Sequence, residues 1–157
     1  PVAEWDIRED GRIIGVTEEL SAQEIYEMGR KVEPFQIASA TRMGHIHLTV
    51  RDSQATSAFY QKVLDLSDKF TIPSASWIAS GVYHHHLAVN EWAGKHLAKR
   101  ETQLPGLAYY VVQVEKKEDL VAIAERAKEQ EAAVTWLTSS ELAFTDPDGI
   151  VTRVRKD

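Results

Sequence analysis

From residue 44 onward, apolar and polar residues follow two similar patterns, each typical of a strand followed by a helix. The first strand, residues 45–50, alternates imidazole or hydroxyl side chains with aliphatic ones, which is the period of an extended strand. The segment after it carries apolar residues at helical spacing from Ala55 to Leu64. A second strand at 109–114 precedes another helical pattern, with apolar positions at Leu120, Ile123, Ala124 and Ala127.

Each unit leaves room for three further strands. In the first unit these are predicted near 67–71, 75–80 and 83–90, and in the second near 134–137, 142–145 and 150–155. The pattern therefore predicts an α+β fold of two βαβββ modules, at residues 42–92 and 106–157. A polar joining segment, 93–105, connects them. We expect the modules to form one curved mixed sheet with its helices on the convex side and a ligand on the concave side.

Alternation also assigns a face to each histidine of the first module. Ile46, Leu48 and Val50 form the face that the helix covers, so His45 and His47 point to the opposite, inner face. In strand 83–90 the same rule turns His84 and His86 to the inner face and His85 to the helix side. The three histidines lie inside a strand pattern and are not interpreted as a purification tag.

The first 41 residues differ from the rest because they contain too few apolar positions to bury a core. One short helix is predicted there, with Ser21 as N-cap, Glu24 completing a capping box and Gly29 near its end. A short strand is predicted at 12–16. The chain begins at Pro1 without a methionine, so it is expected to be either processed or a piece of a longer protein. Because residues 1–41 cannot bury a core of their own, we interpret them as a linker between domains that packs on a neighbour.

Composition narrows the classes of function. The chain has 157 residues and a net charge of -6, which argues against nucleic acid or an anionic membrane as partner. It contains no cysteine, so a thiol nucleophile and a cysteine zinc site are excluded. No transmembrane-length apolar run or signal peptide is found, and a cytoplasmic location is expected.

Four runs of residues carry a family resemblance that covers residues 42–157. They are Gly44-His45-Ile46-His47-Leu48-Thr49-Val50-Arg51-Asp52, Ala58-Phe59-Tyr60, the run from Tyr83 through the triple histidine to Trp92-Ala93-Gly94-Lys95, and Asp146-Pro147-Asp148-Gly149. These runs resemble the vicinal oxygen chelate superfamily of glyoxalases, bleomycin resistance proteins and extradiol dioxygenases. In particular, the chain is similar to the C-terminal half of two-domain catechol 2,3-dioxygenase-like proteins. The resemblance implies an N-terminal half in the parent chain.

The resemblance implies a ferrous ion held by two histidines and one carboxylate, with open sites for a catecholate and dioxygen. The first ligand position matches His45, the second carries Tyr109 and the carboxylate position carries Arg153. A guanidinium has no lone pair for a metal. Two of the three expected ligands are therefore replaced.

An alternative metal set is open to the histidines of the first module. His86 matches a position that supplies a glutamate ligand in glyoxalase-like proteins, so His45 and His86, with His84 as a further candidate, are predicted to bind iron, manganese or zinc. His84, His86 and Tyr109 are the candidate catalytic residues. Arg153 is interpreted as a clamp for a carboxylate, beside Tyr109 as a second substrate-binding residue.

Two functions from different classes follow. The first is metal-dependent oxidative chemistry on a small aromatic substrate. The second is a non-catalytic module in which Tyr109 and Arg153 orient a small anionic or aromatic ligand. A glyoxalase- or fosfomycin-resistance-like reaction ranks last, because the last strand lacks the required glutamate. Exposed sheet edges would also allow a homodimer.

Overall fold

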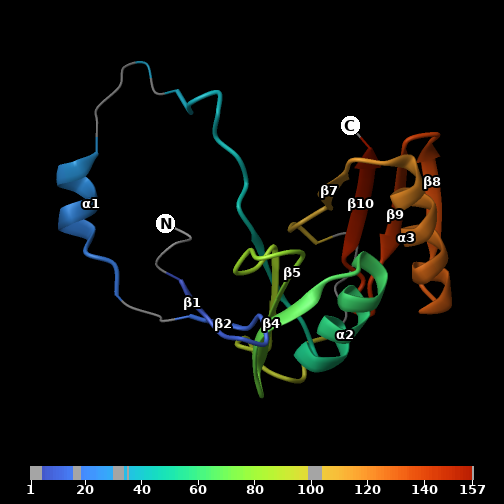
Figure 1. The fold of residues 1–157 in the computed structure, drawn as a ribbon, viewed down its shortest axis with the longest axis horizontal. Helices are drawn as coiled ribbons and strands as arrows, with labels where there is room; N and C mark the ends of the chain where they lie inside the picture. The colour runs from blue at the N-terminus through green and yellow to red at the C-terminus, as the bar shows by residue number, and fades with distance from the viewer. Residues whose placement is uncertain (1–4, 16–18, 30–33, 35, 99–103, 157) are drawn as a thin grey trace.

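The computed structural model describes residues 5–15, 19–29, 34, 36–98 and 104–156 and contains two βαβββ modules (Figure 1). The first comprises β3 (Ile46–Thr49), α2 (Ser53–Leu64), β4 (Ser67–Ile72), β5 (Ala75–Ala79) and β6 (Leu87–Asn90). The second comprises β7 (Tyr110–Val114), α3 (Lys117–Glu129), β8 (Val134–Thr138), β9 (Glu141–Thr145) and β10 (Val151–Lys156). The predicted α+β class and the repeat are confirmed.

Both modules have the same strand order. The first sheet runs β3-β6-β5-β4 and the second β7-β10-β9-β8. In each, the first and last strands of the module are parallel neighbours, and the remaining pairs are antiparallel. One helix crosses over between strands one and two of each module and covers one face of its sheet.

The structure differs from the prediction in how the strands are joined, because they form two four-stranded sheets in place of one curved sheet. The two sheets are connected beyond the end of β3, where the backbone N–H of Arg51 donates to the Oδ1 atom of Asp148 at 3.1 Å. Residues 105–107 line a groove along the edge of β3.

A single apolar core connects the modules. The helix α2 contacts β5 and β6, α3 contacts β9 and β10, and the two helices contact each other. Phe59 and Tyr60 of α2 reach Phe144 of β9, with ring centroids 5.9 and 6.3 Å apart. These rings bury most of their surface, which is the main stabilising contribution to such a core.

The start of α2 is capped from two directions. The Asp52 side chain accepts from the backbone N–H of Ala55 at 2.9 Å, as an N-cap residue does. Glu91, just after β6, accepts from the backbone N–H and the hydroxyl of Ser53, both at 2.8 Å. The second contact joins the start of the helix to the end of the strand beside it.

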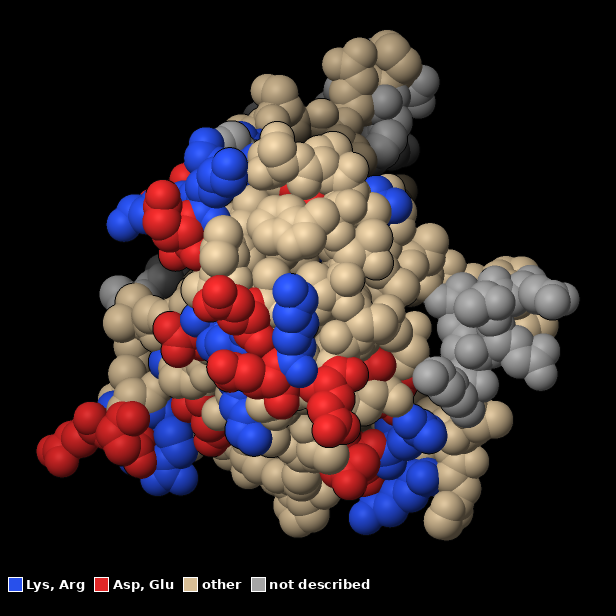
Figure 2. All heavy atoms as spheres, turned by 90° about the vertical axis from the view of Figure 1, so that its right-hand side faces the viewer, with Lys and Arg blue, Asp and Glu red and all other residues tan. Residues whose placement is uncertain are grey.

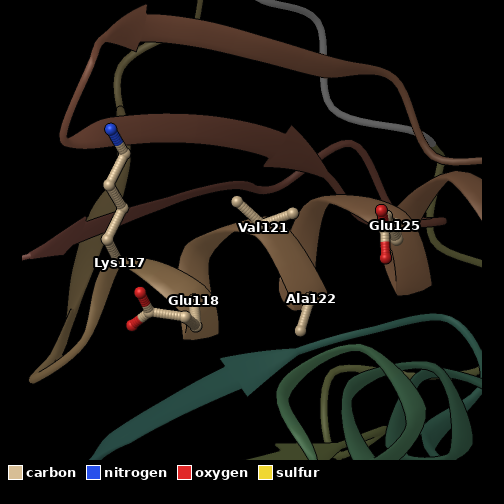
Figure 3. A pocket seen from close by; sticks show the side chains of 5 residues that line it. All are labelled: Lys117, Glu118, Val121, Ala122 and Glu125. Carbon is tan, nitrogen blue, oxygen red and sulfur yellow. The ribbon is translucent and has the colours of Figure 1, made fainter.

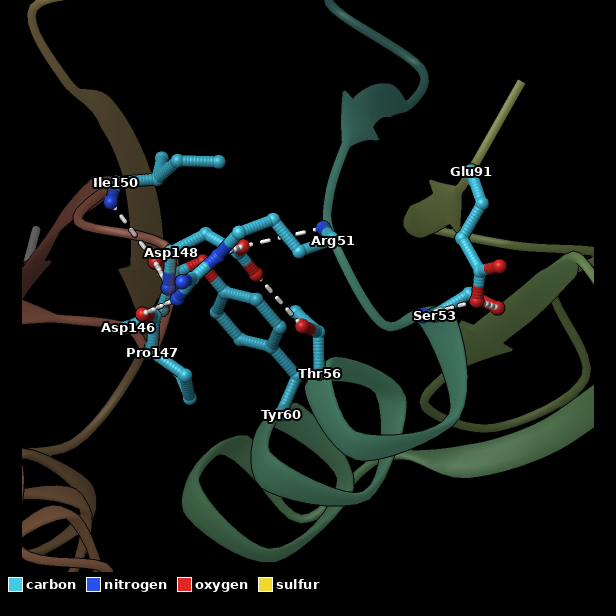
Figure 4. Close-up of polar contacts among 9 residues, drawn as sticks. All are labelled: Arg51, Ser53, Thr56, Tyr60, Glu91, Asp146, Pro147, Asp148 and Ile150. Carbon is cyan, nitrogen blue, oxygen red and sulfur yellow. Dashed lines mark hydrogen bonds and ion pairs between the residues drawn. The ribbon is translucent and has the colours of Figure 1, made fainter. Parts of the chain in front are cut away.

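The turn before β10 connects the second module to α2 (Figure 4). Asp146 accepts from the backbone N–H groups of Asp148 and Ile150, which closes the turn on itself. The Tyr60 hydroxyl of α2 donates to Asp146 at 2.8 Å, and the Thr56 hydroxyl donates to Asp148 at 2.8 Å. Both carboxylates are buried, and these bonds satisfy polar atoms that would otherwise be left unpaired.

The N-terminal part contains β1 (Asp6–Ile7), β2 (Ile13–Ile14) and α1 (Ala22–Met28). Strand β2 contacts β4, and Ile13 is buried there. The predicted cap is present, since Ser21 accepts from the N–H of Glu24 at 3.3 Å. Helix α1 has no buried residue and extends away from the modules (Figure 1). Part of the strand predicted at 12–16 lies outside the described residues.

On the face of the second module shown in Figure 2, acidic and basic side chains are interspersed beside a broad area of other residues. Among the described residues, no helix has the length and apolar content that crossing a bilayer requires.

Candidate functional site

Three imidazoles converge where β3 begins and the segment before β6 ends. We call His45, His84 and His85 the histidine group, because one ring nitrogen of each lies within 4.8 Å of the others. The ring centroids of His45 and His84 lie 4.3 and 4.2 Å from that of His85. Converging imidazoles of this kind are a common donor set for transition metals.

Local packing brings the two segments together. The backbone N–H of Ile46 donates to the carbonyl of His86, which pairs the start of β3 with the triple histidine. Gly44 lies beside Tyr83, and a Cβ atom at this glycine would come within 3.2 Å of the Tyr83 hydroxyl. A side chain at position 44 would therefore require a shift of a few tenths of an ångström in Tyr83, whose ring lies 4.5 Å from that of His84.

The hydrogen bonds of the group leave metal-binding nitrogens free. The Nδ1 atom of His84 is buried and has no hydrogen-bond partner among the described residues. A buried polar atom without a hydrogen-bond partner lowers the stability of the fold, and a bound ligand could supply the missing partner. The Nε2 atom of His85 lies 3.0 Å from Nε2 of His47, outside the group.

The electrostatics of two members of the group, His84 and His85, favour neutral imidazoles. Burial, and next the neighbouring His84, His45 and His47, lower the pKa of His85 to about 3. Burial also lowers the pKa of His84, as do the nearby His45, His86 and His47. Only neutral imidazole has a lone pair for a metal, so these residues are ready ligands at neutral pH.

His86 and His85 are placed differently from what alternation indicates. His86 stacks on Tyr83 with ring centroids 4.7 Å apart, and its Nδ1 accepts from the N–H of Ser80, so it lies outside the histidine group. His85 joins the group in its place. The physical reason is that β6 begins only at Leu87, so residues 84–86 do not follow the strict side-to-side order of a strand.

Trp5 is a residue of this site that the sequence did not indicate. Its ring lies edge-on to His84 and Tyr83, with centroids 4.6 and 5.6 Å away. The N-terminal segment therefore covers one side of the histidine group. Trp5 lies far from Tyr83 and His84 along the chain, so no local pattern in the sequence could indicate this contact.

The open face of the first sheet, the one that α2 does not cover, carries an aromatic row. His47 pairs in register with Ala88, Ala88 with Trp77, and Trp77 with Phe70, so these four side chains cross the sheet together. The rings of Phe70 and Trp77 lie 5.3 Å apart, and both residues are partly buried. The row begins next to the histidine group.

A groove of about 350 Å³ follows the edge of β3 between the modules. Its lining includes His47, Arg51 and Asp148, together with residues 105–107. A second hollow of about 340 Å³ lies on α3 (Figure 3), where Val121 is flanked by Glu118 and Glu125. That hollow contains no convergent donor set, so the groove beside His47 is the better candidate for access to the site.

Tyr109 and Arg153, predicted to act on substrate, lie in the second module. The guanidinium of Arg153 lies 3.7 Å from the centre of the Tyr109 ring, a cation–π contact. Its NH1 atom is 3.6 Å from the Glu141 carboxylate, and the Arg153 side chain is 34% exposed. This ion pair is long, so it leaves guanidinium donors available for another acceptor.

The paired βαβββ modules and the histidine-lined open face define the class of the domain. Residues 42–154 match the family described as the Glyoxalase/Bleomycin resistance protein/Dioxygenase superfamily, and the chain belongs to this superfamily. The curated relative "Catechol-2,3-dioxygenase" from Bacillus subtilis (strain 168) is 32% identical over 130 residues, which cover 82% of this chain. The match covers 46% of that relative, so the chain spans about half of its length.

Solved structures show the same fold. A glyoxylase/bleomycin resistance protein/dioxygenase domain from Frankia sp. EAN1pec is 25% identical, with a TM-score of 0.58 and coverage of 75% of this chain and 98% of that one. Lactoylglutathione lyase from Agrobacterium tumefaciens is 18% identical, with a TM-score of 0.55 and coverage of 75% and 95%. The second likeness concerns the fold alone.

The ligand positions implied by the resemblance do not fit a metal in this chain. Arg153 and Tyr109 contact each other, and a guanidinium cannot ligate. Of those three positions, only His45 belongs to the histidine group. The residues that fit a metal are the three imidazoles of the first module, which can hold a divalent ion.

Proposed function

We propose that this domain binds a divalent transition metal through His45, His84 and His85 and acts beside it on a small aromatic molecule. The convergence of these three imidazoles carries the proposal. The free, buried Nδ1 of His84 supports it, because a metal would satisfy this atom. When bound, the metal would supply Lewis-acid or dioxygen chemistry.

Iron, manganese and zinc were the metals predicted from the sequence. A donor set of three neutral nitrogens favours zinc and other late first-row metals over manganese, which prefers oxygen ligands. His86 and Tyr109 stay predicted catalytic residues. Because Nδ1 of His86 accepts a hydrogen bond, the neutral ring carries its hydrogen on Nε2 and can donate it to a ligand.

The aromatic row supports the class of substrate. Phe70 and Trp77 offer a half-buried apolar surface in the same row across the sheet as His47, on which a planar ring can stack. The relative named "Catechol-2,3-dioxygenase" points to the same kind of molecule. We therefore propose a catechol-like phenol as the substrate of a metal-dependent oxidation.

The test begins with metal-stripped protein titrated with Zn²⁺ in a calorimeter. One ion should bind per chain, and His84→Leu should lose this binding. The matched control His96→Leu removes an exposed imidazole outside the group and should bind as the wild type does. Absence of binding at micromolar metal in the wild type would overturn the proposal. The protein loaded with Fe²⁺ should then take up oxygen when catechol is added. If it binds metal but takes up no oxygen, only the oxidative part of the proposal is wrong.

A second candidate is a non-catalytic module that binds a small carboxylate or phenol at Tyr109 and Arg153. The cation–π contact favours it, because Tyr109 holds the planar guanidinium with donors still free. Benzoate binding should then be lost in Arg153→Gln, without a change in metal content. An Arg155→Gln control, on the same strand, should leave benzoate affinity unchanged.

We also propose two protein partners for this chain. The first is an N-terminal half in the same polypeptide, because the match covers only part of the Bacillus relative. The second is another copy, since β7 and β8 each have one edge without a strand neighbour among the described strands. Analytical ultracentrifugation of the chain measures its oligomeric state, and a monomer at micromolar concentration would contradict the proposed pairing of two copies.

A further inference from the structure

His47 is an exposed histidine that contacts one member of the histidine group. It lies in β3, two residues after His45, and the ring centroids of the two are 5.2 Å apart. Its own contact is with His85, Nε2 to Nε2 at 3.0 Å, with the rings nearly perpendicular at 77°. This is the distance of a hydrogen bond between two imidazoles.

The contact requires that one of the two Nε2 atoms carries a hydrogen and that the other accepts it. Both atoms are ring nitrogens, so one must donate and the other must accept when the rings are neutral. A histidine that binds a metal through one nitrogen carries its hydrogen on the other and usually donates it to a nearby acceptor. In His85 the nitrogen engaged in this way is Nε2, which leaves Nδ1 for the metal.

We propose that His47 is a positioning residue that accepts a hydrogen bond from Nε2 of His85 and so presents Nδ1 of His85 to a divalent metal. This inference rests on the metal site proposed above. His47 itself stays outside the ligand set. Its partner in register across the sheet is Ala88, a small residue that leaves the imidazole free to orient toward His85.

His47 also lines the groove that would lead a ligand to the proposed metal site. The groove between the modules is lined by His47, and the aromatic row begins at the same residue. A substrate that entered along the edge of β3 would meet His47 before the histidine group. His47 therefore links the orientation of a ligand to the place where a small molecule would bind.

The experiment compares His47→Leu, which removes the acceptor, with His47→Gln, which restores one at the position of Nε2. The control is His96→Leu, a histidine exposed elsewhere. The Kd for Co²⁺ should rise about 10- to 100-fold in His47→Leu, as for other lost partners of metal ligands. It should be largely restored in His47→Gln and unchanged in His96→Leu. The Co²⁺ absorption band should shift in His47→Leu alone.

A second measurement is made without metal, by nitrogen–proton correlation of the imidazoles in the NMR spectrum. His85 should be the Nε2–H tautomer in the wild type and in His47→Gln, and should lose this preference in His47→Leu. Wild-type affinity for Co²⁺ in a folded His47→Leu, or a His85 protonated on Nδ1, would overturn the role of His47. If the wild type binds no metal, both the metal site and the role of His47 are wrong. If the wild type binds Co²⁺ and His47→Leu binds it equally well, only the role of His47 is wrong and the metal site stands.

Discussion

Asp148 holds Arg51 across the boundary between the two modules. Its Oδ1 atom accepts from the Arg51 backbone N–H at 3.1 Å and from the guanidinium Nε at 2.9 Å. The guanidinium also donates to the carbonyl of Pro147 at 2.7 Å. The end of the first strand of one module is thereby attached to the turn before the last strand of the other.

Asp148→Asn should lower the free energy of unfolding by about 2 kcal/mol, because it removes the charge from a buried acceptor of charge-assisted hydrogen bonds. The loss stays below that of a fully buried pair, since the Arg51 side chain is 42% exposed. Urea unfolding measures it. The control is Asp65→Asn, at an exposed position with φ 55° that asparagine tolerates. Equal stabilities of the two variants would contradict the role of Asp148.

Asp52→Ala should cost about 1 kcal/mol of stability, because Ala55 loses the acceptor for its backbone N–H at the start of α2. The matched change Ser21→Ala removes the cap of α1, a helix without buried residues. Global unfolding in urea should be unaffected by this second change. A loss of similar size in both variants would show that α1 is part of the cooperative unit.

Stability should fall on acidification below pH 6.5. The pKa of His85 is lowered from 6.5 to about 3 by burial and by the neighbouring imidazoles, so between these values the unfolded chain binds a proton that the folded chain does not. The lowered pKa values of His47, His84 and His86 act in the same direction.

The urea midpoint at pH 7 and pH 5 measures this dependence in the wild type and in His85→Gln. The difference between the two pH values should be smaller in the variant, because one of the responsible groups is gone. His96→Gln, which removes an exposed histidine, should respond to pH as the wild type does. An identical pH dependence in all three proteins would contradict the prediction.

Binding of Cu²⁺ at the histidine group should quench the fluorescence of Trp5, whose ring centroid lies 4.6 Å from that of His84. Saturating metal should therefore remove most of the Trp5 emission. The decrease should be smaller in Trp5→Phe, whereas Trp92→Phe, at a residue that is 63% exposed, should keep it. An equal decrease in Trp5→Phe and in the wild type would contradict an ion beside Trp5.

The periodicity of the sequence was enough to predict both modules and the inward side of β3, since alternation depends only on local backbone geometry. It failed at His85, which lies just before β6, where no strand ladder imposes alternation. The contact between Arg51 and Asp148 joins the two modules across 97 residues, and no local pattern in the sequence indicates it. Trp5 reaches His84 for the same reason without any signal in the sequence.

The nearness of Arg153 to Tyr109 illustrates the limit of reasoning on single strands. Both residues occupy positions at which the family resemblance implies metal ligands. Their contact depends on the parallel pairing of β7 with β10, in which Arg153 lies opposite Val111. A resemblance marks such positions, and only the pairing of strands shows that they form one cation–π unit.

Every imidazole of the histidine group belongs to the first module, while Arg153 and Tyr109 belong to the second. In the functions proposed above, metal binding would use side chains of the first repeat, and ligand binding at Tyr109 and Arg153 would use side chains of the second. Substitutions in the second repeat would then leave the donors of the first in place, so a domain of this design could change its preferred molecule while it retains its centre.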